Sequence, residues 1–525
     1  MISKKILMLV MFFLFLCNTL SEGMCSTACN ICSHTTFVPR TMAQNSVLEL
    51  ALHNYFTYHM PCCSECPPWV SVQVTAPYYF RSTKSHDLAE FFSPNCNECI
   101  TVAQNNTSDI SSLWLGIISP VNAPFSSKIC LRPQRTVIGG AIRLFFDFSS
   151  WFPCDDCWAN NWWASIFIPI QQVRHDLNMV ETSTIGSGTP TVPPSFANVI
   201  AAFSNPDWKY GKLSPKKLKK SGVDDICIKF GVDVIKDSCK HVGVYALGFI
   251  PTGKGTKAEF LFEPLVGSKH AGVGIGFNFD GQAYAGDSQS INFMVDARYA
   301  HLFKHKEIRS VDLFNGDWSR YLLVVSETNP TQPLPGINFF TQEVTVNPRS
   351  VLEVWAALSF NRCNWHLEIG GDFWMRSKEK IKLADKDFGV GILDIAFNPN
   401  SQCPTTAHCA RICQSVPNQP DAPISDSPLF ITVKNSDSAN RQGTSFDGNT
   451  CNGPECSQQN QCSFLNLDSA AHPRALSSTI YAAISWDGCL CSTPAMIGIG
   501  GQYEFAHRTS ALSQYGVWLK TAISF

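Results

Sequence analysis

The chain ends with the stretch Tyr515-Gly-Val-Trp-Leu-Lys-Thr-Ala-Ile-Ser-Phe525. Successive side chains of a β-strand point to opposite faces, so alternate residues share a face. Five residues of the stretch then form one apolar face: Tyr515, Val517, Leu519, Ile523 and Phe525. The opposite face carries Lys520 and small residues, with Trp518 as an apolar exception. This alternation predicts a terminal amphipathic strand with one apolar face and one polar face.

Alternating segments of at least 11 residues recur along the chain. They cover residues 69–81, 137–149, 161–173, 224–235, 239–250, 270–280, 288–303, 349–360, 363–375, 386–398, 477–487, 494–506 and 512–525. A soluble β-sandwich also alternates, but its strands average about 5–6 residues. A tilted strand needs about 9–11 residues to cross a bilayer. The lengths therefore favour an all-β fold, a transmembrane antiparallel β-barrel.

The number of strands follows from parity and from the connections. Thirteen segments plus a weak one at 428–434 give about fourteen, and twelve or sixteen also satisfy the even number of bacterial barrels. Long connections then face outside, and most short turns face the side that holds both termini. The long ones are 82–136, 174–223, 251–269, 304–348 and 435–476. The connection 399–426 departs from this pattern.

These features resemble bacterial outer-membrane β-barrels, in which a closing strand with a terminal Phe is the signal for the barrel assembly machinery. In architecture the chain resembles the fourteen-stranded hydrophobic-substrate channels of the fatty-acid transporter type, which carry an N-terminal plug. It also resembles the cysteine-rich major porins of intracellular bacteria, whose disulfides stiffen the envelope. The resemblance implies an integral protein of the outer-membrane bilayer. The plug signature Asn-Pro-Ala is absent, and no family motif matches, so no functional residue is carried over.

The N-terminal region divides into two expected parts. Residues 1–23 read as a signal peptide, with Lys4 and Lys5 before the apolar run 6–17. Residues 24–68 form a cysteine-rich segment that either plugs the lumen or lies in the periplasm, and 43–58 is compatible with a helix. Residues 69–525 are expected to form the barrel with its loops.

Cysteine is unusually frequent, with 23 in the chain and 22 once Cys17 leaves with the signal peptide. An even number in an exported chain favours disulfides over zinc binding or redox chemistry. Pairing is expected locally, within 24–66, 96–130, 154–157 and 403–462, while Cys227 is either free or tied to an interior segment. The disulfide candidates are Cys25, Cys29, Cys32, Cys62, Cys63, Cys66, Cys96, Cys99, Cys154, Cys157, Cys403, Cys409, Cys413, Cys451, Cys456, Cys462, Cys489 and Cys491.

Charge and motifs narrow the function. Charged residues are 16% of the chain and the net charge is −2, which gives no indication of nucleic-acid binding. The sequence at 248–255 lacks the Ser or Thr of a phosphate loop, and the polar group around His366 has no accompanying serine nucleophile. We therefore expect no enzyme activity, no cofactor and no metal.

The polar faces of the strands supply candidate lumen-facing residues. They are Arg143, Asp147, Asp225, Lys229, Asp233, Asp296, Arg298, His366, Glu368, Asp372, Glu504 and Lys520. Acidic residues outnumber basic ones, so an open pore is expected to pass small solutes passively with a weak preference for cations. The alternative is a structural or adhesive surface protein whose barrel anchors disulfide-stapled loops. A homo-oligomer or a disulfide-linked envelope network is compatible with either function.

Overall fold

The computed structural model describes most of the chain. The described residues are 32–58, 69–103, 108–117, 125–148, 161–185, 196, 198–236, 240–286, 288–313, 317–326, 329–383, 390–392, 432–434, 462–490 and 493–525. The signal-peptide prediction lies outside them. The described chain is dominated by β-strands, most of which belong to one large sheet.

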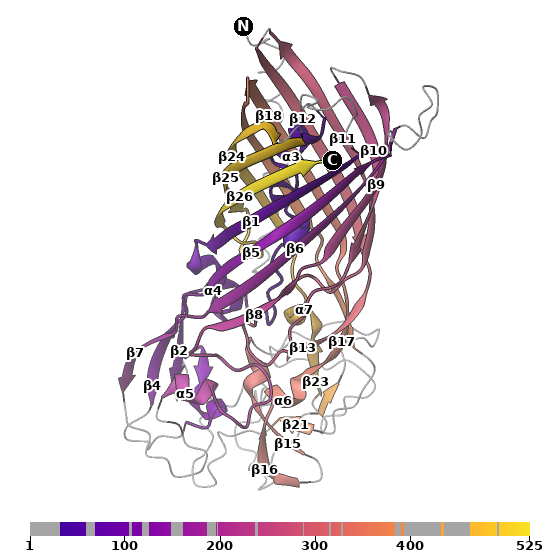
Figure 1. Ribbon diagram of the computed structural model, residues 1–525. Coiled ribbons are helices and arrows are strands. Elements are labelled where there is room, and N and C mark those ends of the chain that lie inside the picture. The colour runs from indigo at the N-terminus through magenta and orange to yellow at the C-terminus, as the bar shows by residue number, and fades with distance from the viewer. Residues whose placement is uncertain are drawn as a thin grey trace.

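Twelve strands of the described chain form a closed antiparallel barrel (Figure 1). They are β1 (Val70–Ser82), β5 (Gln134–Asp147), β6 (Trp162–Asp176), β9 (Ile226–Lys236), β10 (Lys240–Ile250), β11 (Gly272–Ala285), β12 (Gln289–Leu302), β18 (Arg349–Arg362), β19 (Trp365–Arg376), β24 (Ala475–Leu490), β25 (Thr493–Ala506) and β26 (Gln514–Ser524). The terminal strand β26 closes the ring on β1, from Ser71 opposite Ser524 to Ser82 opposite Gln514. A thirteenth strand, β8 (Leu218–Val223), extends the sheet beside β6.

The outer surface of the barrel is apolar. Isoleucines and valines of several strands are exposed on it, including Ile275 at 69%, Ile369 at 58% and Val517 at 50%. At about 3.4 Å per residue and a tilt of about 40°, even an 11-residue strand rises about 29 Å, close to the thickness of a bilayer core. A closed ring leaves no unpaired strand edge in lipid. The chain is thus an integral outer-membrane β-barrel.

The barrel has twelve strands, which is within the range of twelve to sixteen that the sequence allows and two fewer than the favoured fourteen. Two expected strands are absent from the ring. Within 386–398 the described strand is β21 (Val390–Ile392), and within 428–434 it is β22 (Thr432–Lys434), and the two pair with each other outside the barrel. The chain between β19 and β24 is therefore a single long connection that includes 399–426. This segment then no longer departs from the pattern of long connections on one side of the barrel and short turns on the other.

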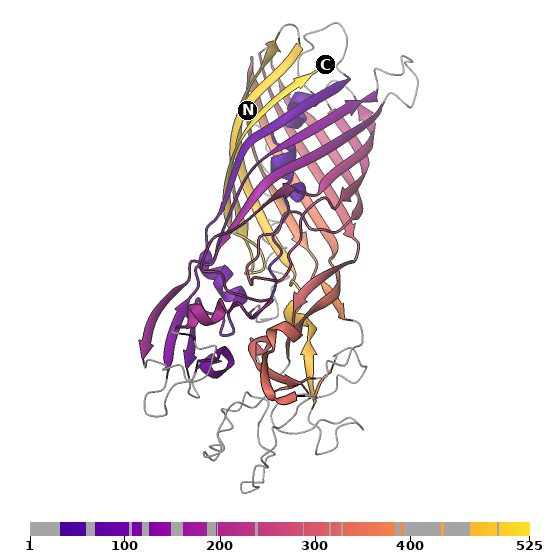
Figure 2. The same ribbon diagram turned by 60° about the horizontal axis from the view of Figure 1, so that its bottom comes forward.

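The long connections gather at the barrel end opposite Phe525, where they form an outer cap (Figures 1 and 2). Three small sheets build the described part of the cap. The first contains β2 (Cys99–Ala103), β3 (Ile110–Ser111), β4 (Ser126–Cys130) and β7 (Val180–Ile185). The second contains β13 (His305–Ser310), β17 (Thr341–Asn347) and β20 (Lys380–Leu383). The third contains β14 (Asp312–Leu313), β15 (Leu323–Ser326), β16 (Asn329–Pro335), β21, β22 and β23 (Cys462–Asn466).

Short helices fill the spaces between these sheets. They are α4 (Ser85–Phe92), η2 (Ser112–Leu115), α5 (Val199–Phe203), η5 (Ser319–Tyr321), α6 (Ile337–Phe340) and α7 (Leu467–Ala470). Two apolar clusters, one centred on Phe91 and Trp318 and one on Leu313 and Phe340, form the cores of the cap. Within the described residues, no helix is long and apolar enough to cross a bilayer.

Residues 38–58 run through the barrel and are called the inner segment below. They contain η1 (Met42–Gln44), α2 (Ser46–Leu50) and α3 (His53–Tyr58), which Figure 2 shows inside the ring of strands. The Asn45 side chain caps α2 by accepting a hydrogen bond from the Leu48 N–H at 2.9 Å. The chain leaves the cap near Thr35 and reaches the short-turn end of the barrel at α3.

Candidate functional site

The inner segment contacts the barrel wall around much of its circumference. It carries one carboxylate, that of Glu49, and one guanidinium, that of Arg40. The two residues are 1% and 6% exposed. Between residues 38 and 58 these are the only acidic residue and the only lysine or arginine. Every other charge that faces them comes from the wall, so the segment and the wall are complementary.

Arg40 binds carboxylates from three strands. Its Nη2 lies 2.5 Å from Asp372 Oδ2 on β19 and 3.2 Å from Glu353 Oε2 on β18. Its Nη1 lies 3.8 Å from Glu504 Oε1 on β25. All four side chains are at most 4% exposed. Arg40 therefore neutralises an acidic stretch of wall that would otherwise be desolvated and repulsive.

Glu49 has the opposite role on the other side of the lumen. Its carboxylate forms an ion pair with Lys229 Nζ on β9 and accepts a hydrogen bond from Arg298 Nη1 on β12, each at 2.7 Å. Arg298 Nη2 also reaches Glu353 at 2.7 Å, which joins the Glu49 and Arg40 contacts into one network. Arg143 adds a hydrogen bond to the Glu49 carbonyl at 3.2 Å. Because each ion has a partner, the network holds the segment in one position.

Backbone groups of the segment are also bound by the wall. Lys520 Nζ donates to the Ala51 carbonyl at 2.6 Å, and the Leu52 N–H donates to Glu368 Oε2 at 3.1 Å. At the cap end the Met42 N–H donates to Asp224 Oδ2 at 2.9 Å. The wall thus satisfies main-chain groups at helix ends that would be costly to bury alone.

Apolar packing completes the fit. Leu48, Leu52 and Phe56 belong to one buried cluster with Trp355 and Trp518 of the wall. The segment approaches the wall closely at Gly498, because a Cβ there would lie 2.5 Å from Leu52 Cδ1. The described lumen is therefore filled by both charged and apolar side chains.

The predicted lumen residues fall into three groups. Arg143, Lys229, Arg298, Glu368, Asp372, Glu504 and Lys520 lie in or beside the network around the inner segment. Asp225, Asp233 and Asp296 are buried but bind other groups, such as Trp163 Nε1 to Asp233 Oδ1 at 2.8 Å. His366 is buried beside the network, with its Nε2 3.2 Å from Glu368 Oε2. Asp147 lies at the short-turn end, where it pairs with Lys236 at 2.9 Å and is 24% exposed, so it is outside the network.

Sequence reasoning did not select Arg40, Glu49 or Glu353, which organise the site. A signal for the first two exists, since they are isolated opposite charges in a stretch otherwise without lysine, arginine or acid. The five residues proposed as the assembly signal lie on the outer face of β26 and at its end, with Tyr515, Val517 and Phe525 exposed.

Disulfides connect the start of the described chain to the cap. Cys32 pairs with Cys96 just after α4, and Cys99 pairs with Cys130 between β2 and β4. The expectation of local pairing is wrong for Cys32, since its partner lies outside 24–66. Cys489 is also disulfide-bonded, whereas Cys227 is free and buried and Cys363 is free and exposed. The candidates outside the described residues are Cys25, Cys29, Cys62, Cys63, Cys66, Cys154, Cys157, Cys403, Cys409, Cys413, Cys451, Cys456 and Cys491, and Cys462 begins β23.

A second ion network lies where the chain passes from the cap into the barrel. Arg309 binds Glu307 at 2.8 Å and Glu379 at 3.2 Å, and His270 Nε2 lies 3.0 Å from Glu307. Burial alone would raise the pKa of Glu307, but Arg309 and His270 outweigh it and lower the pKa to about 2. This carboxylate is therefore ionised at any physiological pH.

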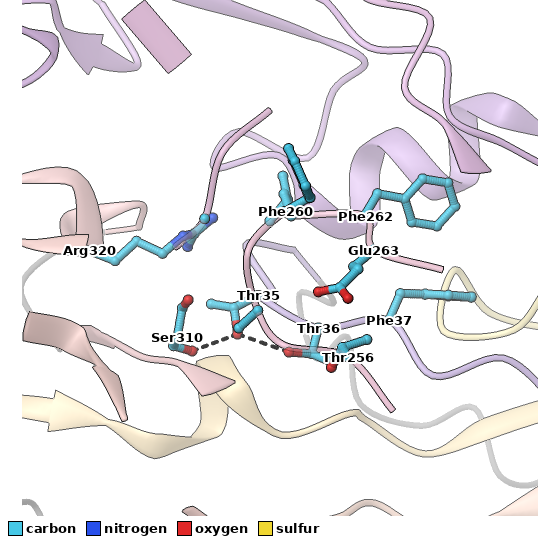
Figure 3. A pocket seen from close by; sticks show the side chains of 12 residues that line it. Thr35, Thr36, Phe37, Thr256, Phe260, Phe262, Glu263, Ser310 and Arg320 are labelled. Carbon is cyan, nitrogen blue, oxygen red and sulfur yellow. Dashed lines mark hydrogen bonds between the residues drawn. The ribbon is translucent and has the colours of Figure 1, made fainter. Parts of the chain in front are cut away.

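A small cavity lies beside this junction (Figure 3). Thr35, Phe37, Phe262, Glu263 and Arg320 are among its lining residues, and its volume is about 20 Å³. A single water needs about 10–15 Å³ by this measure. The cavity therefore has room for one or two waters and is too small to be a substrate site.

No protein-family model matches the sequence, and no curated protein is similar to it. Solved structures similar to the chain include an outer-membrane channel from Pseudomonas putida F1, at 9% identity and a TM-score of 0.35, covering 88% of this chain and 97% of that one. A FadL homologue from Pseudomonas aeruginosa has 9% identity and a TM-score of 0.30, covering 93% and 99%. The transport unit of the Escherichia coli autotransporter AIDA-I has 7% identity and a TM-score of 0.30, covering 92% and 96%. At these scores the fold assignment rests on the strand pairing and the apolar belt.

Proposed function

We propose that the chain is an outer-membrane channel for small hydrophilic solutes, and that the inner segment closes it in the described state. The supporting observation is the charge of the wall. Buried charged residues of the twelve barrel strands comprise eight acids, Asp233, Asp280, Asp296, Glu353, Glu368, Asp372, Asp487 and Glu504, and six bases, Arg135, Arg143, Lys229, Arg298, Arg376 and Lys520. Apolar residues of the same volume would serve stability as well or better. A wall of ions suits a lumen that fills with water when the segment moves.

The excess of acids implies a direction of selectivity. The inner segment contributes one base and one acid, so its displacement leaves the net negative charge of the wall unchanged. An aqueous lumen with this charge attracts cations and repels anions. The open channel is therefore expected to prefer small cations weakly.

The competing function is a surface anchor, and one observation favours it. The described lumen is filled, while the cap carries three sheets and two disulfides between described residues. In that function the barrel would never open, and the cap would be the active part of the molecule.

Planar-bilayer recordings on the full chain separate the two. The test variant Arg40→Gln/Glu49→Gln removes both charges of the inner segment and leaves the wall intact. The matched control, Lys306→Gln/Glu343→Gln, removes an ion pair of similar length from the cap surface. A channel predicts cation-preferring openings that become several times more frequent in the test variant only. Silence of all three folded proteins would refute the channel and support the anchor.

A further inference from the structure

The outer face of β6 marks where the bilayer ends. Ile166, Ile168 and Ile170 face outward in the apolar belt, and Ile170 is 48% exposed. The next outward positions are Gln172, Arg174 and Asp176. Gln172 lies opposite the exposed Ile138 of β5, and Arg174 lies opposite Thr136, so the change from isoleucine to polar residues places the membrane surface near Gln172. Whatever lies beside Arg174 is therefore at the level of the lipid headgroups.

Strand β8 brings lysines to this boundary. It pairs with β6 only over Ile170–His175, and Lys219 lies directly opposite Arg174. Opposed residues of an antiparallel pair point to the same face, so both side chains point outward, and both are exposed. Lys217 reaches the same face, where its Nζ lies 3.4 Å from Asp176 Oδ2 and the side chain is 76% exposed.

The connection after β10 adds a fourth cation. Lys254 Nζ donates to the Ser221 carbonyl of β8 at 3.0 Å, so its exposed side chain lies along the same strand. We call Arg174, Lys217, Lys219 and Lys254 the basic rim. Lys220 is excluded, because it turns to the other face and pairs with Glu263 at 2.9 Å.

The basic rim carries an uncompensated charge. Asp176 is the single acid that pairs with a member of it in the described chain. Lys219 has no ion-pair partner among the described residues. Gln172 occupies the outward position next to Arg174 and accepts a hydrogen bond from its Nε at 2.7 Å, which fixes the guanidinium without neutralising it. The rim thus presents about three net positive charges at headgroup level.

We infer that the basic rim binds anionic, phosphate-bearing headgroups of membrane lipids. Arg and Lys are the residues that recognise phosphate, by paired donors and by a point charge respectively. Each basic side chain beside an anionic lipid surface contributes about fivefold in affinity. The belt below the rim holds the acyl chains of the same lipids, so one molecule meets an apolar wall and a basic edge together. This binding does not depend on whether the lumen conducts.

Native mass spectrometry of the full chain in detergent tests the inference with defined probes. The protein is titrated with dimyristoyl phosphatidylglycerol, with dimyristoyl phosphatidylcholine, or with inorganic phosphate. The test variant is Lys217→Gln/Lys219→Gln/Lys254→Gln. The control, Lys128→Gln/Lys209→Gln/Lys306→Gln, removes the same charge from exposed positions of the cap. Heat-dependent migration verifies that each variant is folded.

The wild type and the control should retain phosphatidylglycerol at least tenfold more tightly than phosphatidylcholine, and the test variant should lose that preference. Inorganic phosphate at the same concentrations should not displace the lipid. If the wild type, the control and the test variant retained phosphatidylglycerol equally tightly, the inference would be overturned. Displacement by phosphate alone would also overturn it, since the rim would then be a site for free phosphate rather than for a lipid.

Discussion

The ion pairs of the inner segment are all buried, whereas the outer cap combines buried pairs such as Arg309–Glu379 with pairs on its surface. Glu49 and Lys229 are separated by 2.7 Å and are at most 2% exposed. Glu343 and Lys306 in the cap are separated by 2.8 Å and are 62% and 71% exposed. Water screens the second pair, while the first cannot separate without leaving a buried charge. Distance alone therefore does not tell which contacts hold the molecule together.

The largest effect is expected from Arg40→Met. It keeps much of the side-chain volume but leaves Asp372, Glu353 and Glu504 with less compensation. Removing one partner from a buried network costs about 3–5 kcal/mol of unfolding free energy. Urea titration of the full chain in detergent micelles measures this loss. A loss of unfolding free energy no larger than that of a cap-surface substitution would show that the buried pairs of the inner segment stabilise the fold no more than surface pairs do.

The next effect concerns the Cys32–Cys96 disulfide. The variant Cys32→Ala/Cys96→Ala frees the cap end of the inner segment and is expected to cost about 2–4 kcal/mol. Maleimide labelling of Cys227, which is free and buried against the lumen, should accelerate in this variant.

Its matched control is Cys99→Ala/Cys130→Ala, which removes a disulfide within the cap. Cys227 labelling should stay slow there, while the exposed Cys363 labels rapidly in both proteins. Equal acceleration in the two variants would mean that the disulfides stabilise the molecule generally and that Cys32 does not tether the inner segment.

A smaller effect is expected from acid, and it should begin in the cap. Burial lowers the pKa of His34 from its ordinary 6.5 to about 4. Between these values the unfolded chain binds a proton that the folded chain does not, so stability falls as the pH drops from 6.5 to 4. The Glu307 carboxylate adds a second loss from about pH 4.5 down to about 2.

Hydrogen exchange of the α4 amides as a function of pH measures this loosening, because the His34 ring stacks on Phe91 of α4 with centroids 4.9 Å apart and the His34 backbone N–H donates to the Phe91 carbonyl. In His34→Gln, the α4 exchange rates should change less between pH 6.5 and 4 than they do in the wild type. The control His86→Gln changes a histidine on α4 whose side chain is 56% exposed, and its profile should match the wild type. An unchanged slope in His34→Gln would assign the loss to another group.

The smallest effect is expected from exchanging the exposed pair, Lys306→Glu with Glu343→Lys. Both side chains are solvated before and after the exchange, so the urea midpoint should not move measurably. A clear shift would show that the cap surface is coupled to the barrel more strongly than its exposure indicates.

The barrel could be predicted because strand length and alternation are properties of the sequence. All twelve ring strands coincide with predicted segments, from β1 at 69–81 to β26 at 512–525. The segment 386–398 was wrongly counted as a barrel strand, because strands outside a membrane also alternate. Its described strand β21 pairs with β15 and β22 outside the ring. Sequence pattern records that a strand has two faces but not what covers them.

The site could be predicted only in part. The alternation of side chains along a strand assigns wall residues such as Lys229 and Arg298 to the inner face of the barrel. It does not show which residues they bind. Their partner Glu49 is separated from Arg298 by 249 positions. The disulfide partner of Cys32 is equally remote in a pattern dominated by nearby cysteines. Contacts of this kind depend on the three-dimensional path of the inner segment, which no periodicity encodes.

The Cys32–Cys96 bond also determines how the molecule carries mechanical force. Residues 32 to 96 form a covalent loop that contains the inner segment, β1 and α4. Tension applied to the chain before Cys32 passes through the sulfur bridge directly to Cys96 and bypasses everything between them. The covalent chain of the inner segment therefore carries little of such a pull as long as the bridge is intact.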